Sequence, residues 1–178
     1  MEKWDLVNSN RQMLGKLHTR GEELEIEEYH IVVEILTVNA DGRILLTQRD
    51  PVKTYPLLWE TTGGSITAGE SSLQGALREL EEETGLKASE KELELLGEIK
   101  YGNHFLDSYI WKRGLPIQPE DLSLQEGEVC DAKLVSLDEF EDMNKNGLIV
   151  PRIAARFELF RDRIIPYLTS EMLKGGSR

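Results

Sequence analysis

The sequence predicts a mixed α/β (α+β) fold in one domain, and three observations lead to that prediction. Several short segments are rich in β-branched and aromatic residues, which is typical of strands. One helical pattern lies in the middle of the chain and others lie near its end, an order that points to α/β or α+β. The chain has 178 residues, and a single domain of that size buries roughly 70% of its unfolded surface.

Residues 1–27 predict a short polar β-hairpin that precedes the main domain. Its first strand would run from Trp4 to Val7 and would turn near residues 8–10. The returning segment would reach residues 24–26. The extension is therefore expected to form a small unit of its own.

Five later segments have the composition of strands, and turn-forming residues separate them. The first two flank Asp41-Gly42, a dipeptide that is common in hairpin turns. Loops are expected at residues 51–58 and 114–125. The five predicted strands are residues 30–38, 43–48, 93–101, 105–112 and 129–135.

A central helix is expected to begin after Ser71, because Ser71 and Gln74 form a capping-box pattern. Gly85 supplies its end, since glycine tolerates the left-handed conformation that closes helices. Between these points a set of residues recurs at spacings of three and four, which places them on one face toward a core. The set is Leu73, Ala76, Leu77, Leu80 and Thr84.

Two more helices are expected near the end of the chain. Ser136, with Glu139 three residues later, predicts the start of a helix that stops near residues 146–147. Pro151 opens the last helix, where a proline in the first turn is well tolerated. Pro166 is expected to interrupt that helix.

The formal net charge is −12, from 33 acidic and 21 basic residues. This charge opposes binding to nucleic acid polymers and to anionic membranes, although acidity that merely aids solubility is an equal alternative. Cys130 is the only cysteine, so no intramolecular disulfide can form, and its side chain is expected to fill the core. No signal peptide or stretch of membrane length is recognised, so a soluble, cytoplasmic protein is expected.

The central helix carries three carboxylates, Glu79, Glu82 and Glu83, within an arc of about 100°. Each like-charged pair costs a few tenths of a kcal/mol, and a divalent cation would reverse the sign of that term. Carboxylate oxygens on a short arc suit Mg²⁺ or Mn²⁺. A solvated acidic face is the alternative, in which Arg78 would be only a surface partner of Glu82.

These residues belong to a longer pattern from Gly64 to Leu86: glycine, five residues, Glu70, seven residues, and then Arg-Glu-Leu-Glu-Glu-Glu-Thr-Gly-Leu. It matches the Nudix box, G-x5-E-x7-R-E-U-x-E-E-x-G-U with U aliphatic, at every fixed position. A chance match has a probability on the order of 10⁻⁷ or less. The chain therefore resembles a Nudix hydrolase.

The resemblance covers roughly residues 28–140 and implies the Nudix fold, a mixed sheet sandwiched between helices. The hydrolase domain is expected to span residues 28–172, followed by a flexible tail at 173–178. The implied activity is Mg²⁺-dependent hydrolysis, with Mn²⁺ as a substitute, of a diphosphate linkage in a small nucleoside diphosphate derivative or related organic diphosphate. A homodimer is common in the family.

The match to the box also implies roles for individual residues. Glu79 is a candidate for the catalytic base, Arg78 would hold a glutamate in position, and Glu70 would be an orienting residue. The implied metal ligands in the box are Gly64, Glu79, Glu82 and Glu83.

Residues outside the box are similar to the branch that contains isopentenyl-diphosphate isomerase: residues 28–30, 45–49, 126–130 and Trp59. In that isomerase, glutamates of a similar segment lie at the metal, so Glu126 and Glu128 are candidates for metal ligand or base, against a plain role at the start of a strand. A histidine like His30 also lies there, but His30 is more simply read as structural.

Six further residues outside the box have alternative readings. Arg49 and Lys53 are candidates to contact phosphate oxygens, or they are ordinary surface bases. Aromatic and imidazole side chains either shape a substrate pocket or belong to the core. These are Tyr55, Trp59, His104 and Tyr109.

The departures from the isomerase favour a hydrolase. The isomerase needs a cysteine and then a histidine shortly after the tryptophan that Trp59 resembles, and residues 60–65 contain neither. The alternatives that stay open are an isomerase-like enzyme and a non-catalytic Nudix-fold sensor of a nucleotide. The substrate is not specified by these residues.

Overall fold

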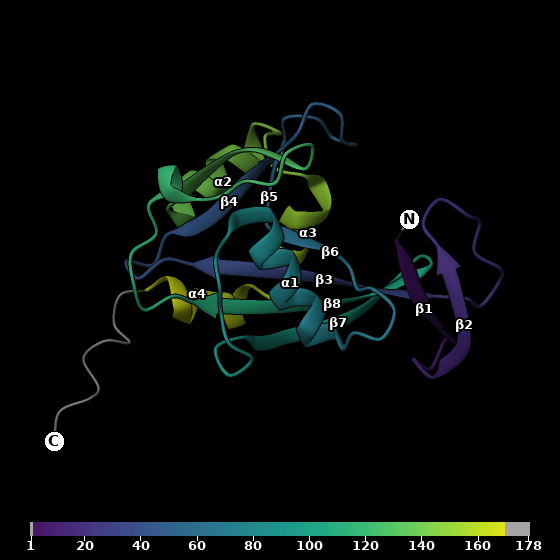
Figure 1. The fold of residues 1–178 in the computed structure, drawn as a ribbon. Helices are drawn as coiled ribbons and strands as arrows, with labels where there is room; N and C mark the ends of the chain where they lie inside the picture. The colour runs from purple at the N-terminus through teal and green to yellow at the C-terminus, as the bar shows by residue number, and fades with distance from the viewer. Residues whose placement is uncertain (1, 170–178) are drawn as a thin grey trace, which may run out of the picture.

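A computed structural model describes residues 2–169, and its strands form a two-stranded sheet and a seven-stranded mixed sheet (Figure 1). The large sheet has the order β5-β4-β3-β8-β7, with β6 also paired to β3 and β9 also paired to β4. The strands are β1 (Lys3–Val7), β2 (Met13–Thr19), β3 (His30–Val38), β4 (Ile44–Arg49), β5 (Trp59–Glu60), β6 (Thr62–Ser65), β7 (Glu94–Tyr101), β8 (His104–Lys112) and β9 (Val129–Val135). The helices are α1 (Ser72–Thr84), the short 3₁₀ turn η1 (Pro119–Asp121), α2 (Leu137–Lys145), α3 (Pro151–Leu159) and α4 (Arg161–Leu168).

The large sheet lies between helices, as the resemblance implies. Alternate residues of β3 point to opposite faces: Val33 and Ile35 pack in the cluster that contains α1, whereas Leu36 and Val38 pack in the cluster that contains α2, α3 and α4. β3 and β8 are parallel, and the other pairs of this sheet are antiparallel. In Figure 1, α1 lies in front of the sheet.

The N-terminal hairpin is confirmed, but its second strand is shorter than expected. β2 ends at Thr19, and residues 24–26 lie outside any strand. Gly21, at φ +99°, turns the chain away from the ladder. The hairpin stands at one end of the large sheet in Figure 1, and the Arg11 side chain in its turn donates two hydrogen bonds to the buried carboxylate of Asp107, at 2.7 and 2.8 Å.

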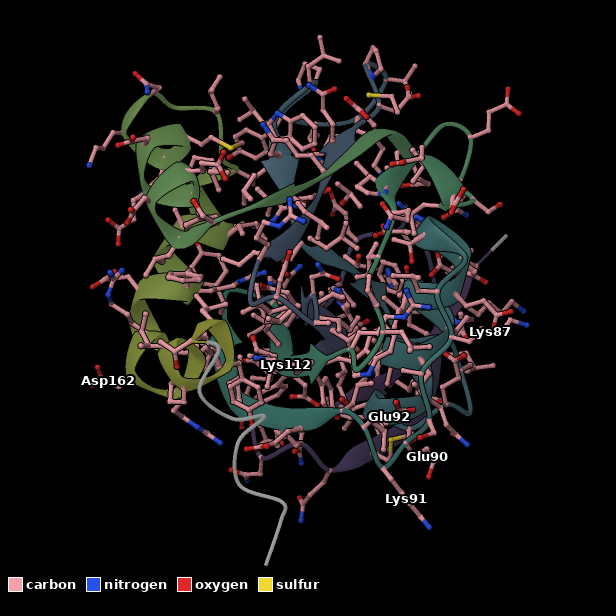
Figure 2. The ribbon with its side chains drawn as sticks, turned by 90° about the vertical axis from the view of Figure 1, so that its left-hand side faces the viewer. Lys87, Glu90, Lys91, Glu92, Lys112 and Asp162 are labelled. Atoms are coloured by element: carbon pink, nitrogen blue, oxygen red, sulfur yellow. The ribbon has the colours of Figure 1, made fainter. Side chains whose placement is uncertain are left out.

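The predicted limits of α1 are confirmed at both ends. The Ser71 hydroxyl accepts from the Gln74 amide, and the Gln74 side chain accepts from the Ser71 amide, so the capping box is complete. Gly85 is left-handed at φ +74°. The loop that follows α1 carries charged side chains directed away from the body, visible at Lys87, Glu90 and Lys91 in Figure 2.

The interruption of the last helix was predicted at the wrong residue. The break lies at Phe160, with φ −104° and ψ 12°, while Pro166 lies inside α4. The Phe160 ring packs against Gly97, where a β-carbon would come within 2.5 Å of it. Lys112 then fastens β8 to α4 through the Tyr167 carbonyl at 2.6 Å; Figure 2 labels Lys112 and the outward Asp162.

The expectation that Cys130 fills the core is wrong, because its side chain is exposed. Val129 and Ala132 are the buried members of this stretch of β9, and the register of β9 against β4 shifts at Arg49. That irregularity leaves Cys130 on the outer side. The expected tail at 173–178 lies outside the described residues. Within residues 2–169, no helix is long and apolar enough to cross a membrane.

Candidate active site

A cavity of about 690 Å³ opens where the hairpin, the central strands, α1 and α3 meet. Two groups of charged side chains line it. We call Arg78, Glu79, Glu82 and Glu83 of α1 the acidic wall, and Arg49, Lys53, Arg152 and Arg156 the basic wall.

The acidic wall holds carboxylates at different depths. Glu79 and Glu83 are 9% and 7% exposed, while the side chain of Glu82 is 45% exposed. Burial raises the pKa of Glu83 well above its ordinary value, and the nearby charges of Glu60 and Glu79 add to that shift. Burial also raises the pKa of Glu79. The described contacts of Glu83 include one weak backbone donor, the Gly63 amide at 3.3 Å.

Gly64 makes close approach to this wall possible. A β-carbon at Gly64 would lie 2.5 Å from the Glu79 Oε1 atom. The strand β6 therefore passes the Glu79 carboxylate at a distance that only a glycine allows. This contact brings a backbone segment and a carboxylate of the box to the same point.

Arg78 links four acceptors around the wall. Its Nε and Nη2 atoms donate to Glu70 at 2.8 and 3.0 Å, and Nη1 donates to Glu79 at 2.8 Å and to Glu82 at 2.9 Å. A further bond reaches the Ser65 carbonyl at 3.1 Å. Glu70 also accepts from the Thr67 amide at 2.8 Å. Arg78 is thus a surface partner of Glu82 and an organiser of the buried Glu79, and Glu70 anchors it.

The donor set of the acidic wall fits a divalent cation. Within residues 2–169, the side chains as arranged form no cluster of three or more metal-ligating groups, and Glu79 and Glu82 are both paired with Arg78. Yet the negative charge of Glu79 contributes to the raised pKa of the buried Glu83, because the two carboxylates repel each other. A bound cation would relieve this repulsion. Hard carboxylate oxygens are the ligands that Mg²⁺ prefers.

Arg49 is not an ordinary surface base. It is 6% exposed, pairs with Glu60, and donates to the carbonyl and hydroxyl of Thr54, the latter at 3.1 Å. Lys53 pairs with Glu128, and burial together with the Arg49 charge lowers the pKa of Lys53. Both bases therefore line the cavity with a carboxylate partner already in contact.

The two glutamates of the later segment are separated. Glu128 lines the cavity beside Lys53. Glu126 is exposed, and the residues that line the cavity do not include it. A candidate role at the metal is accordingly better supported for Glu128 than for Glu126.

The site also contains residues of β3, β5 and α3 that the sequence had not indicated as functional. Arg156 donates to Glu34 at 2.6 Å, and Glu34 also accepts from the Thr61 hydroxyl at 3.0 Å. Arg152 donates to Glu60 at 3.2 Å. Arg152 and Arg156 are four residues apart, which places them on the same face of a helix. Nothing in the local sequence indicates that this face contacts strands so distant along the chain.

The hairpin end of the cavity carries an aromatic stack. The ring of His30 lies 4.4 Å from that of Trp4 and 5.7 Å from that of His104. Burial, with smaller effects of the other histidines, lowers the pKa of His30 to about 4. Tyr55 and His104 line the cavity, whereas Trp59 and Tyr109 belong to the core.

Comparison with known proteins identifies relatives over most of the chain. The model of the NUDIX domain family matches residues 28–153. The chain is 36% identical over 156 residues to an uncharacterized Nudix hydrolase of Listeria monocytogenes, covering 85% of this chain and 89% of that protein. A Clostridium acetobutylicum Nudix hydrolase, also uncharacterized, is 27% identical over 92% of this chain and 89% of its own length.

Solved structures share the fold at lower identity. A Deinococcus radiodurans protein superposes with a TM-score of 0.71 at 19% identity, covering 90% of this chain and 98% of that one. The NUDIX domain of Shewanella oneidensis NrtR, complexed with ADP ribose, gives 0.63 at 20% identity, covering 85% and 96%. A Francisella tularensis bifunctional NMN adenylyltransferase/ADP ribose pyrophosphatase, complexed with AMP and a Mn ion, gives 0.61 at 18% identity, covering 76% and 42%.

Proposed function

Because the chain belongs to the Nudix hydrolase family, we propose that it is a Mg²⁺-dependent enzyme that cleaves a diphosphate linkage in a nucleoside diphosphate derivative. Mn²⁺ would substitute for Mg²⁺. One observation carries this proposal: Glu79 and Glu83 are both buried on α1, with Glu79 directly against Gly64, Glu83 at the Gly63 amide, and Arg78 bridging Glu79 and Glu82.

In this proposal the acidic wall holds the metal. Glu79, Glu82 and Glu83 would supply carboxylate oxygens to it, and Gly64 would supply a backbone group. When bound, the metal neutralises charge on the diphosphate and acidifies water. Arg78 holds Glu79 and Glu82 in place. The two hydrogen bonds that Arg78 donates to Glu70 fix the orientation of its guanidinium group.

Two carboxylates remain candidates for the base that takes the proton of the attacking water. Glu79 is buried at the wall, and Glu128 lines the cavity beside Lys53. Glu126 is the weaker candidate because it is exposed outside the cavity lining. Comparing the pH dependence of kcat in Glu79→Gln and Glu128→Gln would separate the two.

The character of the cavity supports a nucleotide derivative over a prenyl diphosphate. Charged side chains dominate the lining, and its aliphatic members are Val32, Val33 and Ile153. An isoprenoid chain requires an extended apolar surface. The isomerase-like alternative is further weakened because Cys130, the single cysteine, is exposed and does not line the cavity. The complex of the Shewanella domain with ADP ribose makes that compound a natural first test.

The experiment is a panel of ADP ribose, nucleotide sugars, dinucleotides, nucleoside triphosphates and prenyl diphosphates, with and without Mg²⁺. We expect metal-dependent release of a monophosphate, and we expect Glu82→Gln to lower turnover by orders of magnitude without unfolding the protein.

Glu81→Gln is the matched control, because Glu81 lies on the same helix, is exposed, and pairs with Lys87 away from the cavity. Equal turnover in both variants would refute the assignment of the box glutamates. Binding of a panel member without turnover would instead support the sensor alternative.

A further inference from the structure

Arg152 differs from the other members of the basic wall in how many of its donors are without a partner. Its side chain is 41% exposed and, among the residues that the structure describes, makes one ion pair, a 3.2 Å contact from Nη2 to Glu60 Oε2. The side chain of Arg156 is 14% exposed and pairs with Glu34 at 2.6 Å. Arg152 thus keeps most of its guanidinium donors directed at solvent in the cavity.

Arg49 illustrates the opposite case. Its Nη1 is paired with Glu60, and its Nε and Nη2 both donate to Thr54. The side chain is 7% exposed, so a ligand would have to displace these bonds to use it. The sequence suggested Arg49 as a contact for phosphate, but the structure makes it a better support for Glu60 than a binding group.

Glu60 connects the two arginines. One carboxylate oxygen receives Arg49 and the other receives Arg152. A single carboxylate therefore faces two guanidinium groups, and the basic wall has a local excess of positive charge. With Arg49, Arg152 and Arg156 set against Glu34 and Glu60, one positive charge is uncompensated, although the whole chain carries −12.

The position of Arg152 suits an anion held in the same cavity that the acidic wall lines. The Arg152 Cζ atom lies over the Tyr55 ring, 5.8 Å from its centre. A planar guanidinium with free donors matches the oxygens of a phosphate group. Arg49, through Glu60, fixes the direction in which that guanidinium points.

We propose that Arg152 binds a phosphate of the substrate at the basic wall, while the residues of the acidic wall would hold the metal. Arg49 and Glu60 are positioning residues for Arg152. This inference rests on the proposed function for its substrate class, but the binding site itself requires only an anionic phosphate ligand.

The test compares Arg152→Gln and Arg152→Lys with the matched control Arg43→Gln. Arg43 is also an exposed arginine with a carboxylate partner, Asp41, and it lies outside the cavity lining. In Arg152→Gln we expect KM for the diphosphate substrate to rise roughly tenfold to a hundredfold, while kcat changes by less than about threefold, because uniform binding is lost. Arg152→Lys should recover part of the loss, and Arg43→Gln should behave as wild type.

A second readout is binding of inorganic pyrophosphate without added metal, measured by calorimetry. We expect the Kd to rise about tenfold in Arg152→Gln and to stay unchanged in Arg43→Gln. An unchanged KM and Kd in Arg152→Gln, with melting temperature preserved, would overturn the inference.

The two proposals can fail separately. If wild type binds pyrophosphate through Arg152 but hydrolyses no diphosphate, the proposed function fails and the phosphate site stands. If wild type hydrolyses diphosphates and Arg152→Gln leaves KM and Kd unaltered, the phosphate site fails and the proposed function stands. If wild type neither binds nor hydrolyses, both are refuted.

Discussion

The two walls of the cavity are built in opposite ways. The acidic wall draws all four members from six consecutive residues of one helix, and Arg78 is the cation that Glu79 and Glu82 share. The basic wall collects its members from a loop, a strand end and α3, and each base contacts a carboxylate. Within residues 2–169, the buried Glu83 of the acidic wall makes no ion pair, whereas every member of the basic wall makes one.

This difference indicates which charged residues serve catalysis and which stabilise the fold. Carboxylates that are buried together without enough partners destabilise the fold and are retained for chemistry. Buried and paired charges, in contrast, destabilise the fold when one partner is removed. We therefore expect substitutions in the acidic wall to change turnover, and substitutions at the buried part of the basic wall to change stability.

The largest expected effect is on turnover in Glu83→Gln. We expect kcat to fall on the order of 10³-fold or more, because the variant loses a carboxylate ligand of the metal that would offset the charge of the reacting diphosphate. The melting temperature in the presence of a chelator should stay the same or rise, since a buried, repelled carboxylate has been removed. Steady-state kinetics and calorimetry check both parts, with Glu81→Gln as the control; a clearly lower melting temperature would contradict the comparison.

Arg49→Gln should produce the largest loss of stability. Removing Arg49 leaves the largely buried Glu60 with the more exposed Arg152 as its remaining ion-pair partner. We expect the free energy of unfolding to fall by about 3–5 kcal/mol, measured by urea denaturation. The double variant Arg49→Gln/Glu60→Gln should lose less, because no buried charge is left unpaired; an equal or greater loss would show that pairing is not the cause.

Gly64→Ala tests the close approach on the acidic wall. The added methyl would displace the Glu79 carboxylate, the flexible end of a side chain, and leave the backbone in place. We expect kcat to fall roughly 10- to 100-fold and the melting temperature to change little. Gly114→Ala is the control, because a β-carbon there meets nothing within 4 Å. Wild-type kcat in Gly64→Ala would mean that Glu79 need not lie against β6.

The smallest expected effect is stabilisation by added Mg²⁺. At ten times its Kd, a cation that binds only the folded state contributes about 1.4 kcal/mol, a rise of roughly 3–5 °C in melting temperature for a chain of this size. The shift should disappear in Glu83→Gln and persist in Arg152→Gln. If Arg152→Gln instead abolished the rise in melting temperature, the binding of metal and the binding of phosphate would not be separated between the two walls.

Much of the fold was predictable because its signals are local. The Ser71 and Gln74 capping box, the left-handed Gly85 and the second capping box at Ser136 all appear in the structure at the predicted residues. The errors arose where packing decides. The last helix breaks at Phe160 because its ring packs on Gly97, and Cys130 faces outward because the register of β9 shifts.

The sequence by itself determined the acidic wall, since residues three and four apart on a helix share a face whatever surrounds them. Of the basic wall, the sequence suggested Arg49 and Lys53, and only the tertiary structure added Arg152 and Arg156. Arg152 meets Glu60 across 92 residues of sequence, and Arg156 meets Glu34 across 122. Such pairs depend on how α3 packs against the sheet, and no spacing along the chain encodes that contact.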